Sequence, residues 1–211
     1  ALAFKIEGTS FTGSLIVGHS TTGSLDNAYY NTALGIGSMD AITNADYNVA
    51  VGYNAATALT SGAQNTLIGG LAGDALTTGG YNTAVGYSAL TTEDAHGYNT
   101  ALGYRALHNL DAGADAYNVA IGADAGLYMT TGVRNTLLGS QAGDAITTGS
   151  YNVAVGYDAL STEDADGRNV AVGYQALLTQ NAGADAYNVA VGFWAGEKIT
   201  TGIYNTILGG L

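Results

Sequence analysis

The sequence predicts an all-β chain wound into a parallel β-solenoid, and three observations carry this prediction. A five-residue motif recurs about every 17 residues, small and bulky residues alternate within it, and Gly is abundant while Pro is absent. The chain has 211 residues, of which 32 are Gly and none is Pro or Cys. Stacked coils use Gly at tight bends and exclude Pro, because each backbone N–H must reach the neighbouring coil.

The motif reads Asn-(Thr/Val)-(Ala/Leu/Ile)-(Val/Ile/Leu)-Gly, and its copies are separated by 17 residues or, at two steps, by 19. A degenerate copy begins at Ser14. This register predicts about 12 coils of 17–19 residues over residues 14–211, preceded by a lead-in strand or cap over residues 1–13. The Asn residues that open the copies are Asn31, Asn48, Asn65, Asn82, Asn99, Asn118, Asn135, Asn152, Asn169, Asn188 and Asn205.

A second period of 70 residues lies over the first. The segment 111–117 recurs almost unchanged up to Tyr187, and Thr92–Ala95 recurs as Thr162–Ala165. Four coils have therefore been duplicated in tandem, which gives every candidate site an internal control.

Each coil is expected to contain two short strands joined by turns. In residues 82–87 the small Asn, Ala and Gly alternate with Thr, Val and Tyr, which is the period of a strand. A second short strand is expected over residues 87–90, followed by a Thr-Thr-Gly or Thr-Glu-Asp-Ala turn. An Ala three residues after the motif Gly, present in nine of ten complete coils, indicates a thin wall.

Stacking places equivalent residues in ladders. The Asn ladder is expected to be buried, with each side-chain amide bonded to the next. Of two aromatic ladders, we expect one to line the interior and the other to form an interface between identical chains, which indicates an intertwined or side-by-side homotrimer. The first comprises Tyr30, Tyr47, Tyr81, Tyr98, Tyr117, Tyr151, Tyr187 and Tyr204, and the second Tyr53, Tyr87, Tyr104, Tyr157, Tyr174 and Phe193.

The repeat resembles that of two related families. Residues 81–90, Tyr-Asn-Thr-Ala-Val-Gly-Tyr-Ser-Ala-Leu, look like the glycine-rich repeats of phage tail-fibre proteins. The pattern Asn-x-Ala-Val-Gly-x-x-Ala is similar to the shorter repeat of trimeric autotransporter adhesin heads. The resemblance covers nearly the whole chain. It implies a left-handed parallel β-roll, a trimer, no catalytic residue and a segment of a longer fibre.

The composition excludes several function classes. Lys and Arg number 5 against 17 Asp and Glu, a formal net charge of -12, so neither nucleic acid nor an anionic membrane surface is an expected partner. The absence of Cys excludes disulfides and thiolate zinc sites. No stretch reaches the ~18–20 apolar residues of a membrane span, and the first residues do not match a secretory signal.

The sequence assigns no catalytic residue, no cofactor and no metal. The chain has three histidines, His19, His96 and His108. The duplication maps His96 to Asp166 and His108 to Leu178. A site that depended on either histidine would lack its twin, so all three are interpreted as solvated turn residues.

Two acidic turns, Glu93-Asp94 and Glu163-Asp164-Asp166, recur at one loop position. Paired carboxylates can bind Ca²⁺ or act as general acid and base. The calcium motif of β-helices, Gly-Gly-x-Gly-x-Asp, is absent. The sequence therefore favours solvated charged turns that keep the coil edges soluble.

The remaining hypotheses concern single residues that lie outside the motif and the acidic turns. Asp74 and Asp144 are interpreted as turn caps, and Arg134 and Arg168, which interrupt the first aromatic ladder, are predicted to stack on neighbouring Tyr rings. Trp194 is the only Trp and the candidate ligand contact, because an exposed aromatic ring can stack on a sugar. The alternative is that Trp194 fills an end coil.

The predicted function is that of a non-enzymatic shaft or head segment of a trimeric phage tail fibre, located in the virion or at a cell surface. Its partners would be two further copies of itself and a cell-surface glycan or protein, bound through avidity. Three alternatives stay open: a bacterial trimeric adhesin head, a self-assembling extracellular filament, and an ice-binding solenoid suggested by the recurrent Thr-Thr-Gly. An enzyme is expected only if a pocket forms between protomers.

Overall fold

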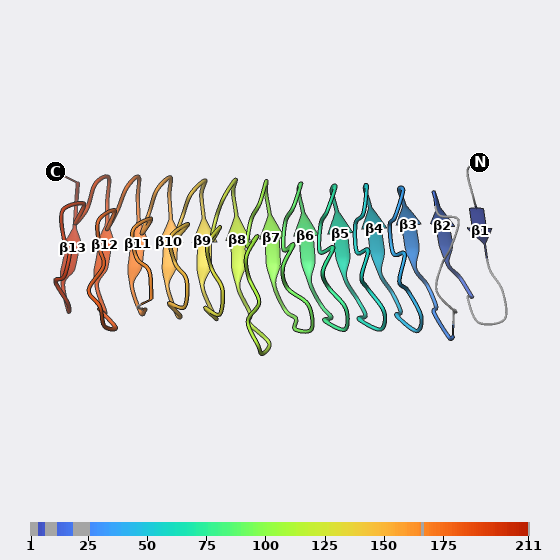
Figure 1. Ribbon diagram of the computed structural model, residues 1–211. Coiled ribbons are helices and arrows are strands. Elements are labelled where there is room, and N and C mark those ends of the chain that lie inside the picture. The colour runs from blue at the N-terminus through green and yellow to red at the C-terminus, as the bar shows by residue number, and fades with distance from the viewer. Residues whose placement is uncertain (1–3, 7–11, 19–25, 166, 211) are drawn as a thin grey trace.

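The computed structural model describes residues 4–6, 12–18, 26–165 and 167–210. These residues form a rod of stacked coils that runs from β1 to β13 (Figure 1). Among them is no helix long and apolar enough to cross a membrane. The strands are β1 (Phe4–Ile6), β2 (Leu15–Val17), β3 (Thr32–Leu34), β4 (Val49–Val51), β5 (Thr66–Ile68), β6 (Thr83–Val85), β7 (Thr100–Leu102), β8 (Val119–Ile121), β9 (Thr136–Leu138), β10 (Val153–Val155), β11 (Val170–Val172), β12 (Val189–Val191) and β13 (Thr206–Leu208).

Strands β2 to β13 pair in chain order, and all of these pairings are parallel. The register follows the repeat, so that Ala84 lies beside Ala101, and Ala101 beside Ala120 across a 19-residue step. The two extra residues fall in a longer loop between β7 and β8, visible in Figure 1. The predicted parallel β-solenoid is confirmed. β1 adds an antiparallel strand against β2.

The prediction of a second strand over residues 87–90 is wrong, because these residues form a turn. Ser88 and Leu90 have φ of 52° and 53°, a left-handed conformation that cannot continue a strand. The N–H of Ser88 donates to the carbonyl of Gly70 at 2.9 Å, and that of Leu90 to the carbonyl of Ala106 at 3.0 Å. These bonds between coils offset the roughly 1–2 kcal/mol that a left-handed residue costs.

The interior is narrow and filled by complementary volumes. Five of the ten coils that start at residues 31–188 place Ala at the strand centre and a larger residue in the turn, as with Ala84 and Leu90, which are both fully buried. Where Leu67 occupies the strand centre, the turn position is Gly73, and a Cβ there would lie 2.9 Å from the Leu67 side chain. Large and small residues thus complement one another within a coil or between neighbouring coils, as where Leu107 and Leu137 flank Gly126, which keeps the interior close-packed.

The predicted Asn ladder is buried, but it bonds mainly to backbone. Oδ1 of Asn118 accepts the backbone N–H of Asn135 at 2.9 Å, and Nδ2 of Asn118 donates to the carbonyl of Gly132 at 2.8 Å. The expected bond from amide to amide is longer here, at 3.3 Å from Nδ2 of Asn135 to Oδ1 of Asn118. Asn118 therefore ties its own coil closed and also binds the next coil.

Candidate functional site

The outer face of the sheet carries many exposed apolar side chains along the rod. In each parallel strand the central residue points inward and the two flanking residues point outward, as in β7, where Ala101 is buried and Leu102 is 41 % exposed. Three outward columns result: the first strand residue, the third strand residue, and the residue after the motif Gly. None of the 17 acidic and 5 basic residues of the chain falls in these columns between residues 31 and 210. We call these columns the sheet face.

Both aromatic ladders lie on the outside, so the expectation that one of them lines the interior is wrong. The ring centroids of Tyr81 and Tyr98 are 4.8 Å apart and those of Tyr98 and Tyr117 are 4.9 Å apart, with the rings stacked. In the second ladder, Tyr174 stacks on Phe193 at 5.0 Å. The interior is too narrow for a ring, because it is filled by Ala and Leu. The second ladder belongs to the sheet face, and the first borders it.

The predicted stacking of Arg134 and Arg168 on Tyr rings is confirmed. The guanidinium of Arg134 lies 5.9 Å from the ring centroid of Tyr117 and 5.5 Å from that of Tyr151. Arg168 lies 5.5 Å from the ring centroids of Tyr151 and Tyr187, and it also forms an ion pair with Asp185. The Arg side chains therefore continue the ladder where Tyr is missing.

Trp194, the candidate ligand contact, is half-buried. Its indole N–H donates to Oε1 of Gln175 at 2.8 Å, and its ring packs against Phe193 at 4.4 Å. Trp194 also lines a depression of about 530 Å³ together with Ile199 and Ile207. One edge of the indole is thus fixed by the preceding coil, and the remainder borders this depression.

The Thr residues of the Thr-Thr-Gly turns bond between coils. Oγ1 of Thr77 donates to the carbonyl of Asp94 at 2.9 Å, and Oγ1 of Thr130 to that of Thr147 at 3.2 Å. These bonds between coils explain why the first Thr of the pair recurs. An ice-binding surface is not needed to explain it.

The acidic turns differ from the prediction that they are solvated. Asp94 and Asp164 are exposed, but Glu93 and Glu163 are fully buried. Both Glu residues occupy a position in the coil that is apolar in most other coils, as with Leu76. His19 and Asp166 lie outside the described residues.

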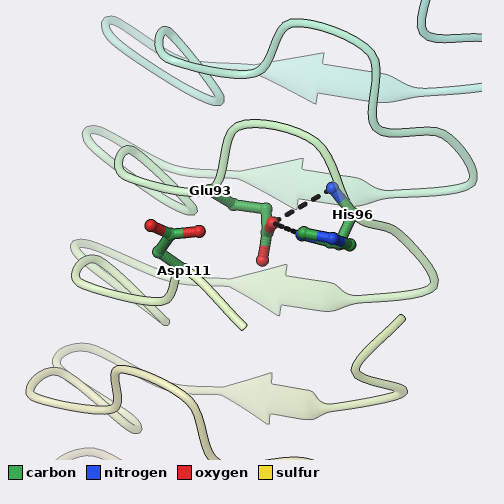
Figure 2. A group of neighbouring side chains, drawn as sticks. All are labelled: Glu93, His96 and Asp111. Carbon is green, nitrogen blue, oxygen red and sulfur yellow. Dashed lines mark hydrogen bonds and ion pairs between the residues drawn. The ribbon is translucent and has the colours of Figure 1, made fainter. Parts of the chain in front are cut away.

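Glu93, His96 and Asp111 come together at the junction of two coils (Figure 2). One ligand atom from each residue lies within 4.8 Å of the other two. Nδ1 of His96 is 3.3 Å from Oε1 of Glu93, an oxygen that also accepts the His96 backbone N–H at 3.1 Å. Burial raises the pKa of the Glu93 carboxyl, and the Asp111 carboxylate adds to this effect, while backbone N–H groups and His96 oppose it.

This cluster escaped the sequence interpretation, which treated its histidine and its acidic turn separately. Asp111 stands 18 residues after Glu93. Because residues one coil apart are stacked, this spacing is the signal that could have paired them. The sequence also contained an indication that Glu93 is buried, because the same coil position holds Leu76 and Leu110 in the adjacent coils.

Asp144 is another carboxyl whose pKa is raised by burial. Burial, and then the nearby Asp158 carboxylate, raise its pKa to about 6, while the backbone N–H of Ala145 acts in the opposite direction. This backbone contact agrees with the predicted turn cap. Oδ1 of Asp144 nevertheless has no hydrogen-bond partner among the described residues.

We therefore expect the substitution Asp144→Asn to stabilise the rod at pH 7. A folded-state pKa of about 6 lies above the ordinary Asp value of 3.8, so the Asp144 contribution is fully present below pH 3.8 and is lost as the pH rises to about 6. The gain should be about 1 kcal/mol at pH 7, because the half-exposed carboxyl is partly screened by solvent. Urea unfolding between pH 4 and pH 8 tests this. An equal gain at pH 4 and pH 7 would contradict the charge explanation.

The fold and the repeat together define the chain as a β-solenoid repeat protein. No protein-family model, no curated protein and no solved structure matches it.

Proposed function

We propose that this chain is a non-enzymatic structural segment, the shaft or head of a trimeric phage tail fibre, which presents repeated contacts to a host surface. The sheet face is the observation that carries this proposal. It extends along the rod from β3 to β13 without a charged residue. A chain of net charge -12 would otherwise repel copies of itself.

The size of the sheet face supports association of identical chains. A face about five residues wide, over strands spaced by about 4.8 Å, covers roughly 900 Å². This is close to the ~800 Å² that each partner buries in a stable protein interface. Leu34, Ile36 and Tyr53 on this face are 51 %, 70 % and 61 % exposed, which is unusual for large apolar side chains in a continuous patch. Three copies around an axis would cover it.

The mass in solution tests the proposal. We expect three times the 21.2 kDa of one chain by light scattering. The double variant Leu102→Glu with Leu138→Glu places two carboxylates on the sheet face and should give a monomer. Tyr128→Glu is the matched control, because Tyr128 is 55 % exposed but lies outside the three columns, and its mass should remain that of the trimer.

Two outcomes would overturn the proposal. A stable wild-type monomer would remove the interface on which the trimer rests. Open-ended growth seen by electron microscopy would instead support a self-assembling filament. A receptor-binding role is tested separately, by binding of the purified trimer to host cells.

A further inference from the structure

The coil position of Glu93 is apolar in most of the rod. This position lies 11 residues after the motif Asn, as Glu93 lies after Asn82. The fully buried residues at this position in other coils include Ile42, Leu59, Leu76, Leu110, Met129 and Ile146. Only Glu93, Glu163 and Gln180 are polar at this position among the coils that start at residues 31–188. A buried carboxylate is costly unless it is compensated by partners.

Glu163 and Gln180 bond to the Asn ladder, whereas Glu93 bonds to backbone N–H groups outside it. Oε2 of Glu163 accepts a hydrogen bond from Nδ2 of Asn169 at 3.2 Å, and Oε1 of Gln180 from Nδ2 of Asn188 at 3.0 Å. Both side chains therefore serve the Asn ladder. The equivalent Asn99 donates to the carbonyl of Gly97 at 3.3 Å instead. The Glu93 carboxyl group therefore does not accept a hydrogen bond from Asn99, and it faces His96 and Asp111.

The surroundings of Glu93 suit a cation. Asp111 brings a second carboxylate from the following coil, and the charged groups that act on Glu93 are His96 and Asp111. Nδ1 of His96 is buried, and its 3.3 Å contact with Oε1 of Glu93 lacks the geometry of a hydrogen bond. Among the residues that the structure describes, Oε2 of Glu93 accepts one long contact, 3.4 Å from the N–H of Ala112. Two carboxylates and an imidazole nitrogen thus converge with unused acceptor capacity.

We propose that Glu93, His96 and Asp111 form a binding site for a first-row divalent transition-metal ion, and Zn²⁺ is the ion used to test it. One imidazole nitrogen and two carboxylate oxygens are ligands that Zn²⁺ accepts at about 2.0–2.2 Å. The exposed Asp111 side chain can rotate inward to reach that distance. Ca²⁺ fits poorly, because it takes about 6–8 oxygen ligands. Three protein ligands leave a fourth position for water.

The bound ion would join two coils of different length. Glu93 and His96 belong to the 17-residue coil 82–98, and Asp111 to the 19-residue coil 99–117, where the longer loop begins. The 70-residue duplication keeps the carboxylate as Glu163 but places Asp and Asn at the other two positions. Without an imidazole, the second copy lacks the nitrogen ligand, so one tight site is expected per chain.

Calorimetric titration of the full chain with ZnCl₂ tests the proposal. We expect one tight site per chain, with binding to CaCl₂ at least ~100-fold weaker. His96→Ala and Asp111→Ala should each weaken Zn²⁺ binding by at least ~30-fold. Asp94→Asn is the control, since it removes an exposed carboxylate next to Glu93 and should bind Zn²⁺ as the wild type does.

Glu93→Leu separates metal binding from folding. Leu is the natural residue at this position in neighbouring coils, so the variant should fold and melt above the metal-free wild type. It should also show no rise in melting temperature with Zn²⁺, whereas the wild type should show one. Absence of binding at a ZnCl₂ concentration of about 1 mM would overturn the proposal, because a site with a Kd above this value would be too weak to count as a metal site. Unchanged binding in both His96→Ala and Asp111→Ala would overturn it as well.

Discussion

Replacing Gly156 by Ala should abolish the stable rod. Gly156 has a φ of +135°, and a Cβ there would lie 2.3 Å from the carbonyl oxygen of Gly173 in the next coil. The clash is with backbone, so no side-chain rotation can relieve it. We expect the free energy of unfolding to fall by at least ~4 kcal/mol, measured by urea unfolding followed by circular dichroism.

Gly113→Ala is the matched control. Gly113 has a φ of +67°, so Ala is strained there too, but a Cβ at this position would meet no atom within 4 Å. The expected cost is only about 1 kcal/mol, that of a left-handed Ala. If both variants lost the same stability, the clash between coils would not be the cause and backbone strain alone would explain the effect.

The same contact explains why the fold was predictable. The motif Gly recurs because each copy touches the Gly of the next coil, as Gly156 touches Gly173. A steric requirement that repeats at every coil leaves a periodic trace in the sequence. The buried Asn ladder leaves a second one for the same reason. The period, the parallel stacking and the buried Asn residues could therefore be predicted.

The single strand per coil could not be predicted. Ser88 and Leu90 are left-handed, although neither residue type favours that conformation locally. Their φ angles are set by hydrogen bonds to residues about one coil away, such as Gly70 and Ala106. Local alternation of residue types does not report these bonds, so it predicts a strand where a turn forms.

The candidate metal site and the outward position of the Tyr ladders could not be predicted from the sequence, because both depend on the width of the interior. Ala and Leu fill it, which forces the rings outward. The same narrowness brings Glu93 inside, because the residues at its coil position are fully buried in all coils that start at residues 31–169, whatever their polarity. The charge of Glu93 predicts exposure, whereas the fold places this residue by its position in the coil.

Replacing Asn118 by Ala should also strongly destabilise the rod. Oδ1 of Asn118 accepts the N–H of Asn135 at 2.9 Å, and its Nδ2 donates to the Gly132 carbonyl at 2.8 Å. Removing the amide leaves a buried N–H and a buried carbonyl without partners, at about 1–3 kcal/mol each. We expect a loss of about 3–4 kcal/mol, measured by urea unfolding.

Two further variants define the cause of this loss. Asn44→Ala removes an exposed Asn outside the ladder and should change stability by less than ~0.5 kcal/mol. Asn118→Asp keeps an oxygen that can accept the N–H of Asn135 but loses the donor to Gly132, and it buries a charge. At pH 7 it should therefore be at least as damaging as Ala. At pH 4 the carboxyl that this substitution introduces is protonated and can donate again, so Asn118→Asp should recover stability relative to Asn118→Ala. If Asn118→Asp kept the stability of the wild type at both pH values, Asn118 would act by filling space and not by bonding two coils.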